Sequence, residues 1–244
     1  MRKTTLLPSE DTEVLRHLHR TDNLVEKDTI PHLEEKIVRT HARIQWRIEE
    51  RLRDFRKIWE KGSNRDLFYE LAFCLLTPSS RARSASQALE RLNQRGLLFN
   101  GSHEQIAEHL NIVRFRYKKA RFIVEARNRF FGAGNRSIRE TIMGFDSGFE
   151  KRRWLAEHIC GMGFKEASHF LRNIGLEGET AILDRHILRK MCSVGLMEKA
   201  PESLTGKQYV WIEKLFLDYS KHIGIPAAHL DFTLWFMATG DLYK

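Results

Sequence analysis

Apolar residues recur at steps of three and four along most of this chain, and this helical period is the feature that most restricts its fold. The longest example covers residues 31–59, where one apolar stripe predicts a long amphipathic helix. No convincing run of alternating apolar and polar residues competes with these patterns. The 244 residues also include only 5 Pro and 15 Gly, too few for a chain dense in turns. The sequence therefore predicts an all-α protein.

Local end signals divide this helical pattern into segments. Gly62 ends the first helix, and Ser63 with Asp66 predicts a capping box at the start of the next. That helix stops near Thr77-Pro78, because the residue before a proline avoids helical geometry. We expect two helical subdomains flanking a cleft, with an N-terminal tail at residues 1–30, an N-terminal helical subdomain at 31–140 and a catalytic subdomain at 141–244.

The charge balance indicates the kind of partner. The chain has 41 Lys plus Arg against 32 Asp plus Glu, a formal charge of +9, which favours a polyanion. Three scattered cysteines are too few for a disulfide framework or a four-cysteine metal site. The sequence contains neither a signal-peptide pattern nor an apolar stretch of membrane-spanning length, so we expect a cytoplasmic protein with no membrane partner.

The segment from residue 155 to residue 191 carries the most chemical information. A helix with an apolar face ends at Gly161-Met162-Gly163, and a second helix begins at once. Two glycines around one apolar residue allow a tight reversal with Met162 tucked between the helices. The exposed amides at the start of the second helix would then form an anion site. The pattern predicts a helix-hairpin-helix.

A lysine and an aspartate follow this turn. Lys165 lies in the first turn of the second helix, and Asp184 comes 184 − 165 = 19 residues later. The helix dipole disfavours a protonated ammonium at this end and partial burial acts in the same direction, so Lys165 is a candidate nucleophilic amine. If either residue stood alone, it would instead be typical of an ordinary surface lysine or of an aspartate that only caps a helix.

These residues carry a family resemblance. Gly161-Met-Gly-Phe-Lys165 followed by Ile182-Leu-Asp184-Arg-His186 resembles the helix-hairpin-helix DNA glycosylase superfamily, in its lysine-bearing bifunctional branch. Four further segments, 73–78, 116–127, 181–189 and 239–244, resemble the type-2, chiefly archaeal, 8-oxoguanine DNA glycosylase/lyase family. The resemblance covers roughly residues 33–244. Because no four-cysteine cluster follows Asp184, the chain does not resemble the iron–sulfur members of the superfamily.

The resemblance implies a DNA repair enzyme that flips 8-oxoguanine out of the duplex, excises it, and cleaves the strand by β-elimination at the abasic site. Lys165 would attack C1′ of the damaged nucleotide and remain as a Schiff base. Asp184 would orient or deprotonate the lysine and stabilise positive charge on the sugar. This chemistry requires no cofactor and no metal.

Further residues would hold the DNA and the base. For DNA binding we expect Gly161, Gly163, His186, Arg116 and Lys119, and for base recognition Trp235, Lys244 and Phe115. Trp235 precedes the last residue by 244 − 235 = 9 positions, the spacing that the type-2 family implies for a base pocket closed by the C-terminal carboxylate. Trp235 and Phe115 are also compatible with core packing, and His186 with a solvated helix start.

Two other interpretations of the sequence remain open. A non-catalytic helix-hairpin-helix module would bind DNA phosphates without sequence preference. A glycosylase of the same mechanism could instead remove another oxidised base, such as an oxidised pyrimidine. The partner that we expect is double-stranded DNA containing 8-oxoguanine, bound by a monomer that associates with the nucleoid when it holds DNA.

Overall fold

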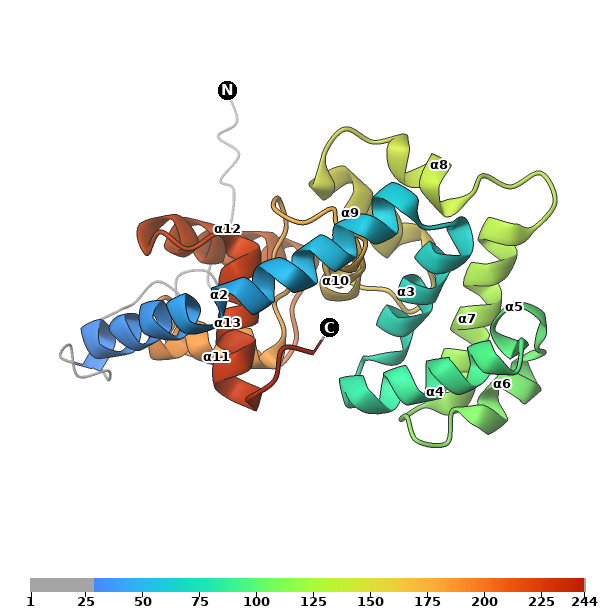
Figure 1. Cartoon of the computed structure of the whole chain (residues 1–244), viewed down its shortest axis with the longest axis horizontal. Helices are drawn as coiled ribbons and strands as arrows, with labels where there is room; N and C mark the ends of the chain where they lie inside the picture. The colour runs from blue at the N-terminus through green and yellow to red at the C-terminus, as the bar shows by residue number, and fades with distance from the viewer. Residues whose placement is uncertain (1–28, 244) are drawn as a thin grey trace, which may run out of the picture. The chain divides into compact units, whose positions relative to one another are not determined.

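The computed structural model describes residues 29–243, and within these residues it contains twelve α-helices and no β-strand (Figure 1). The predicted all-α class is confirmed. The helices are α2 (Thr29–Lys61), α3 (Asn64–Leu76), α4 (Ala82–Gln94), α5 (Leu97–Asn100), α6 (His103–His109), α7 (Arg116–Phe131), α8 (Ile138–Met143), α9 (Gly148–His158), α10 (Phe164–Asn173), α11 (Arg185–Ser193), α12 (Gly206–His222) and α13 (Ala227–Thr239).

Serine and threonine caps begin several of these helices. The predicted capping box of Ser63 and Asp66 is confirmed at α3, where the Ser63 hydroxyl accepts from the Asp66 amide and the Asp66 carboxylate accepts from the Ser63 amide. The same reciprocal pair forms at α6, between Ser102 and Gln105. Each box satisfies two amides that the first helical turn leaves without a partner, so these local sequence signals set the helix starts.

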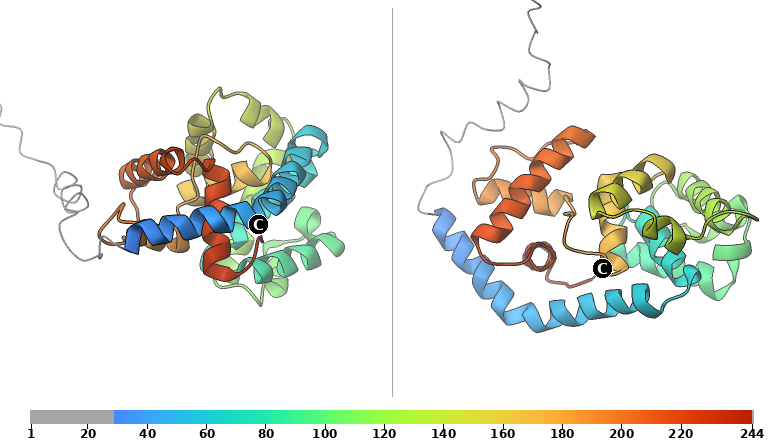
Figure 2. Two further views of the ribbon diagram at one scale, coloured as in Figure 1. Left: turned by 60° about the vertical axis from the view of Figure 1, so that its left-hand side comes forward. Right: turned by 90° about the horizontal axis from the view of Figure 1, so that it is seen from above.

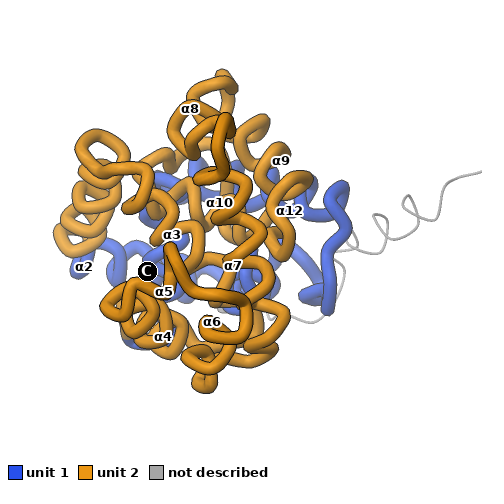
Figure 3. Tube along the Cα trace, turned by 90° about the vertical axis from the view of Figure 1, so that its right-hand side faces the viewer, with its two compact units in different colours: residues 1–44, 183–240 blue, residues 45–182, 241–244 orange. Residues whose placement is uncertain are grey.

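The chain divides into two compact units, which Figure 3 shows in different colours. Unit 1 comprises residues 1–44 and 183–240, and unit 2 comprises residues 45–182 and 241–244. Helix α2 contributes to both units. These limits differ from the predicted border at residue 140, because α10 packs against both α9 and α3 and so joins the hairpin to the preceding helices. The assignment of catalysis to residues 141–244 stays a prediction.

Unit 2 holds the hairpin on a large apolar core. Ala167, Phe170 and Leu171 of α10 are fully buried in this core, and Ile174 closes the same face. A buried hydrogen bond from Asn173 Nδ2 to Glu70 Oε2, 3.1 Å long, ties the end of α10 to α3. This contact supplies the partner that a buried amide needs.

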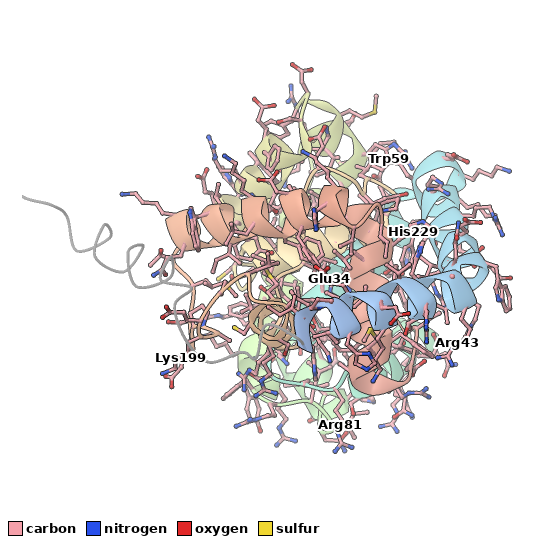
Figure 4. All side chains as sticks on the ribbon, turned by 90° about the vertical axis from the view of Figure 1, so that its left-hand side faces the viewer. Glu34, Arg43, Trp59, Arg81, Lys199 and His229 are labelled. Carbon is pink, nitrogen blue, oxygen red and sulfur yellow. The ribbon has the colours of Figure 1, made fainter. Side chains whose placement is uncertain are left out.

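Unit 1 contains α11, α12, α13 and the first part of α2. Helix α13 contacts both α11 and α12, and the views in Figure 2 show these helices together, coloured orange to red. On the other side of α13, His229 Nδ1 lies 3.0 Å from His41 Nε2 of α2. The guanidinium of Arg43 lies 5.8 Å from the ring centroid of Phe236, and Figure 4 labels Arg43 and His229 on these two helices. Two polar contacts therefore orient α2 on α13.

Candidate functional site

The hairpin turn has the geometry that the sequence predicts. Gly161 has a φ of +85°, which side-chain-bearing residues rarely adopt, and a Cβ at this position would lie 2.1 Å from Cδ2 of Phe122 in α7. Met162 is buried at 4% exposure, so the apolar residue between the two glycines is tucked into the core as expected. The turn thus needs a glycine at position 161 for conformation and for space.

Lys165 lies in the first turn of α10, two residues after the turn ends. Its side chain is 24% exposed, and its Nζ lies 3.4 Å from Oε1 of Glu166. The other carboxylate oxygen of Glu166 accepts a hydrogen bond from the Gly163 amide, at 3.3 Å. One of the amides expected to form an open anion site is therefore engaged by Glu166 in this structure, and a phosphate that binds Gly163 must displace or share that carboxylate.

Asp184 is the N-cap of α11. Its Oδ1 accepts from the backbone amides of His186, at 2.8 Å, and Ile187, at 2.9 Å, while Oδ2 accepts no hydrogen bond from residues 29–243. The preceding residue is anchored as well, since the Leu183 amide donates to the Tyr209 hydroxyl at 3.1 Å. These hydrogen bonds hold the Asp184 side chain in one orientation and leave Oδ2 available to contact a ligand. Asp184 belongs to unit 1 and Lys165 to unit 2.

His186 and Trp235 meet within unit 1. Their rings pack edge to face, with centroids 5.1 Å apart and an interplanar angle of 86°. Trp235 is partly buried, and its Nε1 is shielded from solvent without an acceptor among the described residues. A buried N–H of this kind is costly unless a ligand supplies the acceptor. The contact groups a predicted DNA-binding residue with a predicted base-recognition residue.

The predicted role of Lys244 concerns a residue that lies outside the described part of the chain. The residues just before it are held by α4 within unit 2. Arg83 forms an ion pair with Asp241, with 2.5 Å between Nη2 and Oδ2, and its guanidinium lies 5.4 Å from the ring centroid of Tyr243. The ion pair also raises the pKa of Arg83.

Arginine and aromatic side chains alternate where α7 begins. Phe115 and Tyr117 are each 60% exposed, which excludes the core role that the sequence left open for Phe115. The guanidinium of Arg114 lies 5.3 Å from the Phe115 ring, and that of Arg116 lies 4.8 Å from the Tyr117 ring. We call residues 114–117 the Arg–aromatic cluster. Tyr117 was not predicted from the sequence, although the interleaved basic and aromatic pattern of Arg-Phe-Arg-Tyr was available as a signal.

Lys119 does not lie where a phosphate could reach it. Its side chain is buried, at 3% exposure for the residue, and Nζ donates to Leu76 O (2.7 Å), Pro78 O (2.8 Å) and Ser80 Oγ (2.9 Å). An ammonium has three donors, and all of them are used. The expectation that Lys119 contacts DNA is therefore corrected, because this lysine holds the segment between α3 and α4 instead.

Burial lowers the pKa of Lys119 to about 8, and the positive charges of Lys165 and Arg114 act in the same direction. In the unfolded chain, Lys119 keeps its ordinary pKa of 10.5. Between about pH 8 and pH 10.5 the unfolded state therefore binds more protons than the folded state. We therefore expect the free energy of unfolding to rise with pH across this window, by about 3 kcal/mol in total from this group. Urea unfolding of wild type and Lys119→Met at several pH values measures this term, and an identical pH dependence in both proteins would contradict it.

Among residues 29–243, no three His, Cys, Asp or Glu side chains gather closely enough to hold a metal ion. None of the described helices combines the length and the apolar character that a bilayer crossing requires.

Comparison with known proteins places this site in context. A family model described as 8-oxoguanine DNA glycosylase matches residues 48–225, a span that includes the hairpin, Lys165 and Asp184. A protein from Fusobacterium nucleatum named 8-oxoguanine DNA glycosylase/AP lyase is 39% identical over 209 residues, which cover 86% of this chain and 96% of the relative. A protein of the same name from Korarchaeum cryptofilum is 38% identical over 205 residues, which cover 83% of this chain and 93% of the relative.

Solved structures agree with these matches. The 8-oxoguanine DNA glycosylase of Thermotoga maritima superposes with a TM-score of 0.78 at 30% identity, covering 88% of this chain and all of the other. The glycosylase/lyase of Methanocaldococcus jannaschii, solved with a 15mer DNA containing 8-oxoguanine, gives a TM-score of 0.79 at 29% identity, covering 87% of this chain and all of the other.

Proposed function

The chain belongs to the 8-oxoguanine DNA glycosylase family, and from this membership we propose how its own residues remove 8-oxoguanine from DNA and cut the strand. It is a DNA N-glycosylase and abasic-site lyase of the helix-hairpin-helix type. The observation that carries the proposal is the place of Lys165, which begins α10 directly after the hairpin turn with its amine partly exposed. A pure DNA-binding module has no use for a lysine at this position together with Asp184.

In the proposed reaction, the neutral amine of Lys165 attacks C1′ of the damaged nucleotide and forms a C–N bond. The glycosidic bond breaks at the same carbon, and the base leaves with its electron pair and takes up a proton. The C1′–O4′ bond of the sugar then breaks, O4′ takes up a proton from the attacking amine, and the C–N bond becomes a Schiff base. This Schiff base acidifies C2′, so loss of a proton there expels the 3′ phosphate and cuts the strand. Water then hydrolyses the Schiff base and restores the lysine. Asp184, through its open Oδ2, would stabilise the positive charge that develops on the sugar.

The extruded base needs an aromatic surface and an edge reader. We propose that Trp235 and Phe115 supply ring contacts and that the C-terminal carboxylate of Lys244 reads the base. The buried Nε1 of Trp235 supports a ligand contact, and the exposed ring of Phe115 supports a role outside the core. An enzyme for oxidised pyrimidines is the second candidate, and the purine is favoured by the names of the relatives.

The proposed DNA surface combines the hairpin with the Arg–aromatic cluster. Arg116 is half-buried, and its guanidinium lies over the ring of Tyr117. His186 would contact the backbone near the lesion. Affinity should fall with salt by a log–log slope of about −0.9 per neutralised phosphate. We also propose that the protein acts as a monomer and inside the cell, at the nucleoid, because its substrate is genomic DNA.

Borohydride trapping tests this function directly. We expect a covalent protein–DNA adduct with a duplex that carries one 8-oxoguanine, because borohydride reduces the Schiff base to a stable amine. Matched duplexes with guanine or an oxidised pyrimidine at the same position should give little adduct. Adduct only with the pyrimidine lesion would assign another substrate, and binding without adduct on any duplex would favour a non-catalytic module.

A further inference from the structure

Two residues of unit 2 have a backbone conformation that costs energy. Ser79 has a φ of +55° and Phe115 a φ of +60°, and they are the non-glycine residues with positive φ among residues 29–243. For a bulky residue such as phenylalanine this conformation is a true outlier. Backbone strain of this kind persists where the surroundings hold it in place, and it clusters at functional sites.

A single hydroxyl connects the two strained positions. Ser80 Oγ accepts from Nζ of Lys119 at 2.9 Å and from the backbone amide of Arg114 at 3.0 Å. A serine hydroxyl has two acceptor positions, so these two bonds use both of them. Each strained residue is the immediate neighbour of one member, since Ser79 precedes Ser80 and Phe115 follows Arg114.

Lys119 contacts both segments as well. Its ammonium donates to Leu76 O, Pro78 O and Ser80 Oγ, which surrounds the turn that contains Ser79. Its backbone amide donates to Phe115 O at 3.0 Å, in the first turn of α7. The Phe115 N-cap forms no side-chain cap of its own, so this start of α7 depends on the contacts around it. We call Lys119, Ser80 and the Arg114 amide the Lys119 hub.

The hub is connected to the helix that carries the proposed nucleophile. The ammonium of Lys119 binds the carbonyl of Leu76, the last residue of α3, and α3 packs against α10, in whose first turn Lys165 lies. The ring that the hub supports projects into solvent, because Phe115 is 60% exposed while Lys119 is 3% exposed. A buried cation thus supports an exposed aromatic ring in the unit that contains the proposed nucleophile.

We propose that Lys119 and Ser80 are positioning residues, which hold the strained start of α7 so that the ring of Phe115 is in place to contact the extruded base. This inference rests on the proposed function, and it adds two residues that touch neither DNA nor base. Without the hub, Phe115 would relax toward an ordinary conformation and its ring would turn away. The glycosylase step needs that ring, whereas β-elimination at an abasic site, which has no base, does not.

The test compares the two steps in four variants. Ser80→Ala removes the shared acceptor, and Ser80→Thr is its matched control because it keeps a hydroxyl. Lys119→Met removes the ammonium, and Lys118→Met is its control because Lys118 is the exposed neighbour on the same helix. Each variant is measured for single-turnover release of 8-oxoguanine, for cleavage of a preformed abasic-site duplex, and for amide hydrogen exchange in residues 77–80 and 114–117.

We expect Ser80→Ala and Lys119→Met to slow base release by about tenfold and abasic-site cleavage by less than about threefold, since a small misplacement of a contacting group has effects of this size. Exchange should become faster in both segments of these variants. Ser80→Thr and Lys118→Met should keep the wild-type rate of base release. If Lys119→Met does not fold, Ser80→Ala carries the test alone, because it leaves the buried ammonium in place.

Three results would overturn the proposal. Base release at the wild-type rate despite faster exchange would show that the ring needs no hub. If base release and abasic-site cleavage slowed equally, the hub would act on the chemistry of Lys165 instead of on the Phe115 ring. If amide hydrogen exchange did not change, the hub would hold neither residues 77–80 nor residues 114–117. Failure of the proposed function would give a different result, because the wild-type protein itself would then release no 8-oxoguanine. The amide hydrogen exchange of the variants would still show whether the hub holds the two segments.

Discussion

Replacing Lys165 with glutamine is expected to slow both base release and strand cleavage by about 10⁴-fold or more, because loss of a covalent nucleophile commonly costs this much. The borohydride adduct should disappear completely, since glutamine has no amine that can form a Schiff base. The protein should still fold, because Lys165 is partly exposed and forms an ion pair with its neighbour in sequence, Glu166, rather than a contact in the core. It should also still bind damaged DNA, which fluorescence anisotropy with a labelled duplex would measure.

Lys118→Gln is the matched control for this substitution. It makes the same chemical change on an exposed helical lysine of the same unit, so it should keep both rates and weaken binding by no more than one phosphate contact. Adduct formation that survives in Lys165→Gln would assign the nucleophile to another amine. Loss of binding together with activity would instead point to a misfolded hairpin, which circular dichroism would reveal.

The sequence predicted those parts of the fold that depend on neighbouring residues. The predicted capping box at Ser63 is confirmed, because its partner Asp66 lies only three residues away. The long amphipathic helix predicted at residues 31–59 is confirmed as α2, which spans Thr29–Lys61. Helix α8 was missed, because its six residues are too short to show an apolar period.

The parts that could not be predicted depend on residues far apart in the chain. Lys119 looked like one of many exposed basic residues, and its burial follows from acceptors 39 to 43 positions earlier. Phe115 is exposed at the strained start of α7, and no local sequence pattern predicts a positive φ at a phenylalanine. The roles of Lys165, Asp184, Trp235 and Lys244 come from the family resemblance and stay predictions until the variants are measured.

Gly161 and Gly163 flank the same residue, yet their replacement by alanine is expected to have very different effects. Gly161→Ala should lower the free energy of unfolding by about 2–4 kcal/mol, from the positive φ and from the clash of the new Cβ with the Phe122 ring. The ring cannot move aside easily, because Phe122 is 9% exposed and packs in the core of unit 2. The hairpin amides should shift with the turn, so DNA affinity should fall as well.

Gly163→Ala is the matched control for this clash. Gly163 has an ordinary φ of −93°, and its Cβ would meet Oε2 of Glu166 at 3.2 Å, which is the movable end of a side chain. We therefore expect a stability loss below about 1 kcal/mol. Urea unfolding of the two variants beside wild type measures both values. Equal losses would mean that the backbone of the turn can rearrange, and that contact with Phe122 does not fix the position of the hairpin on α7.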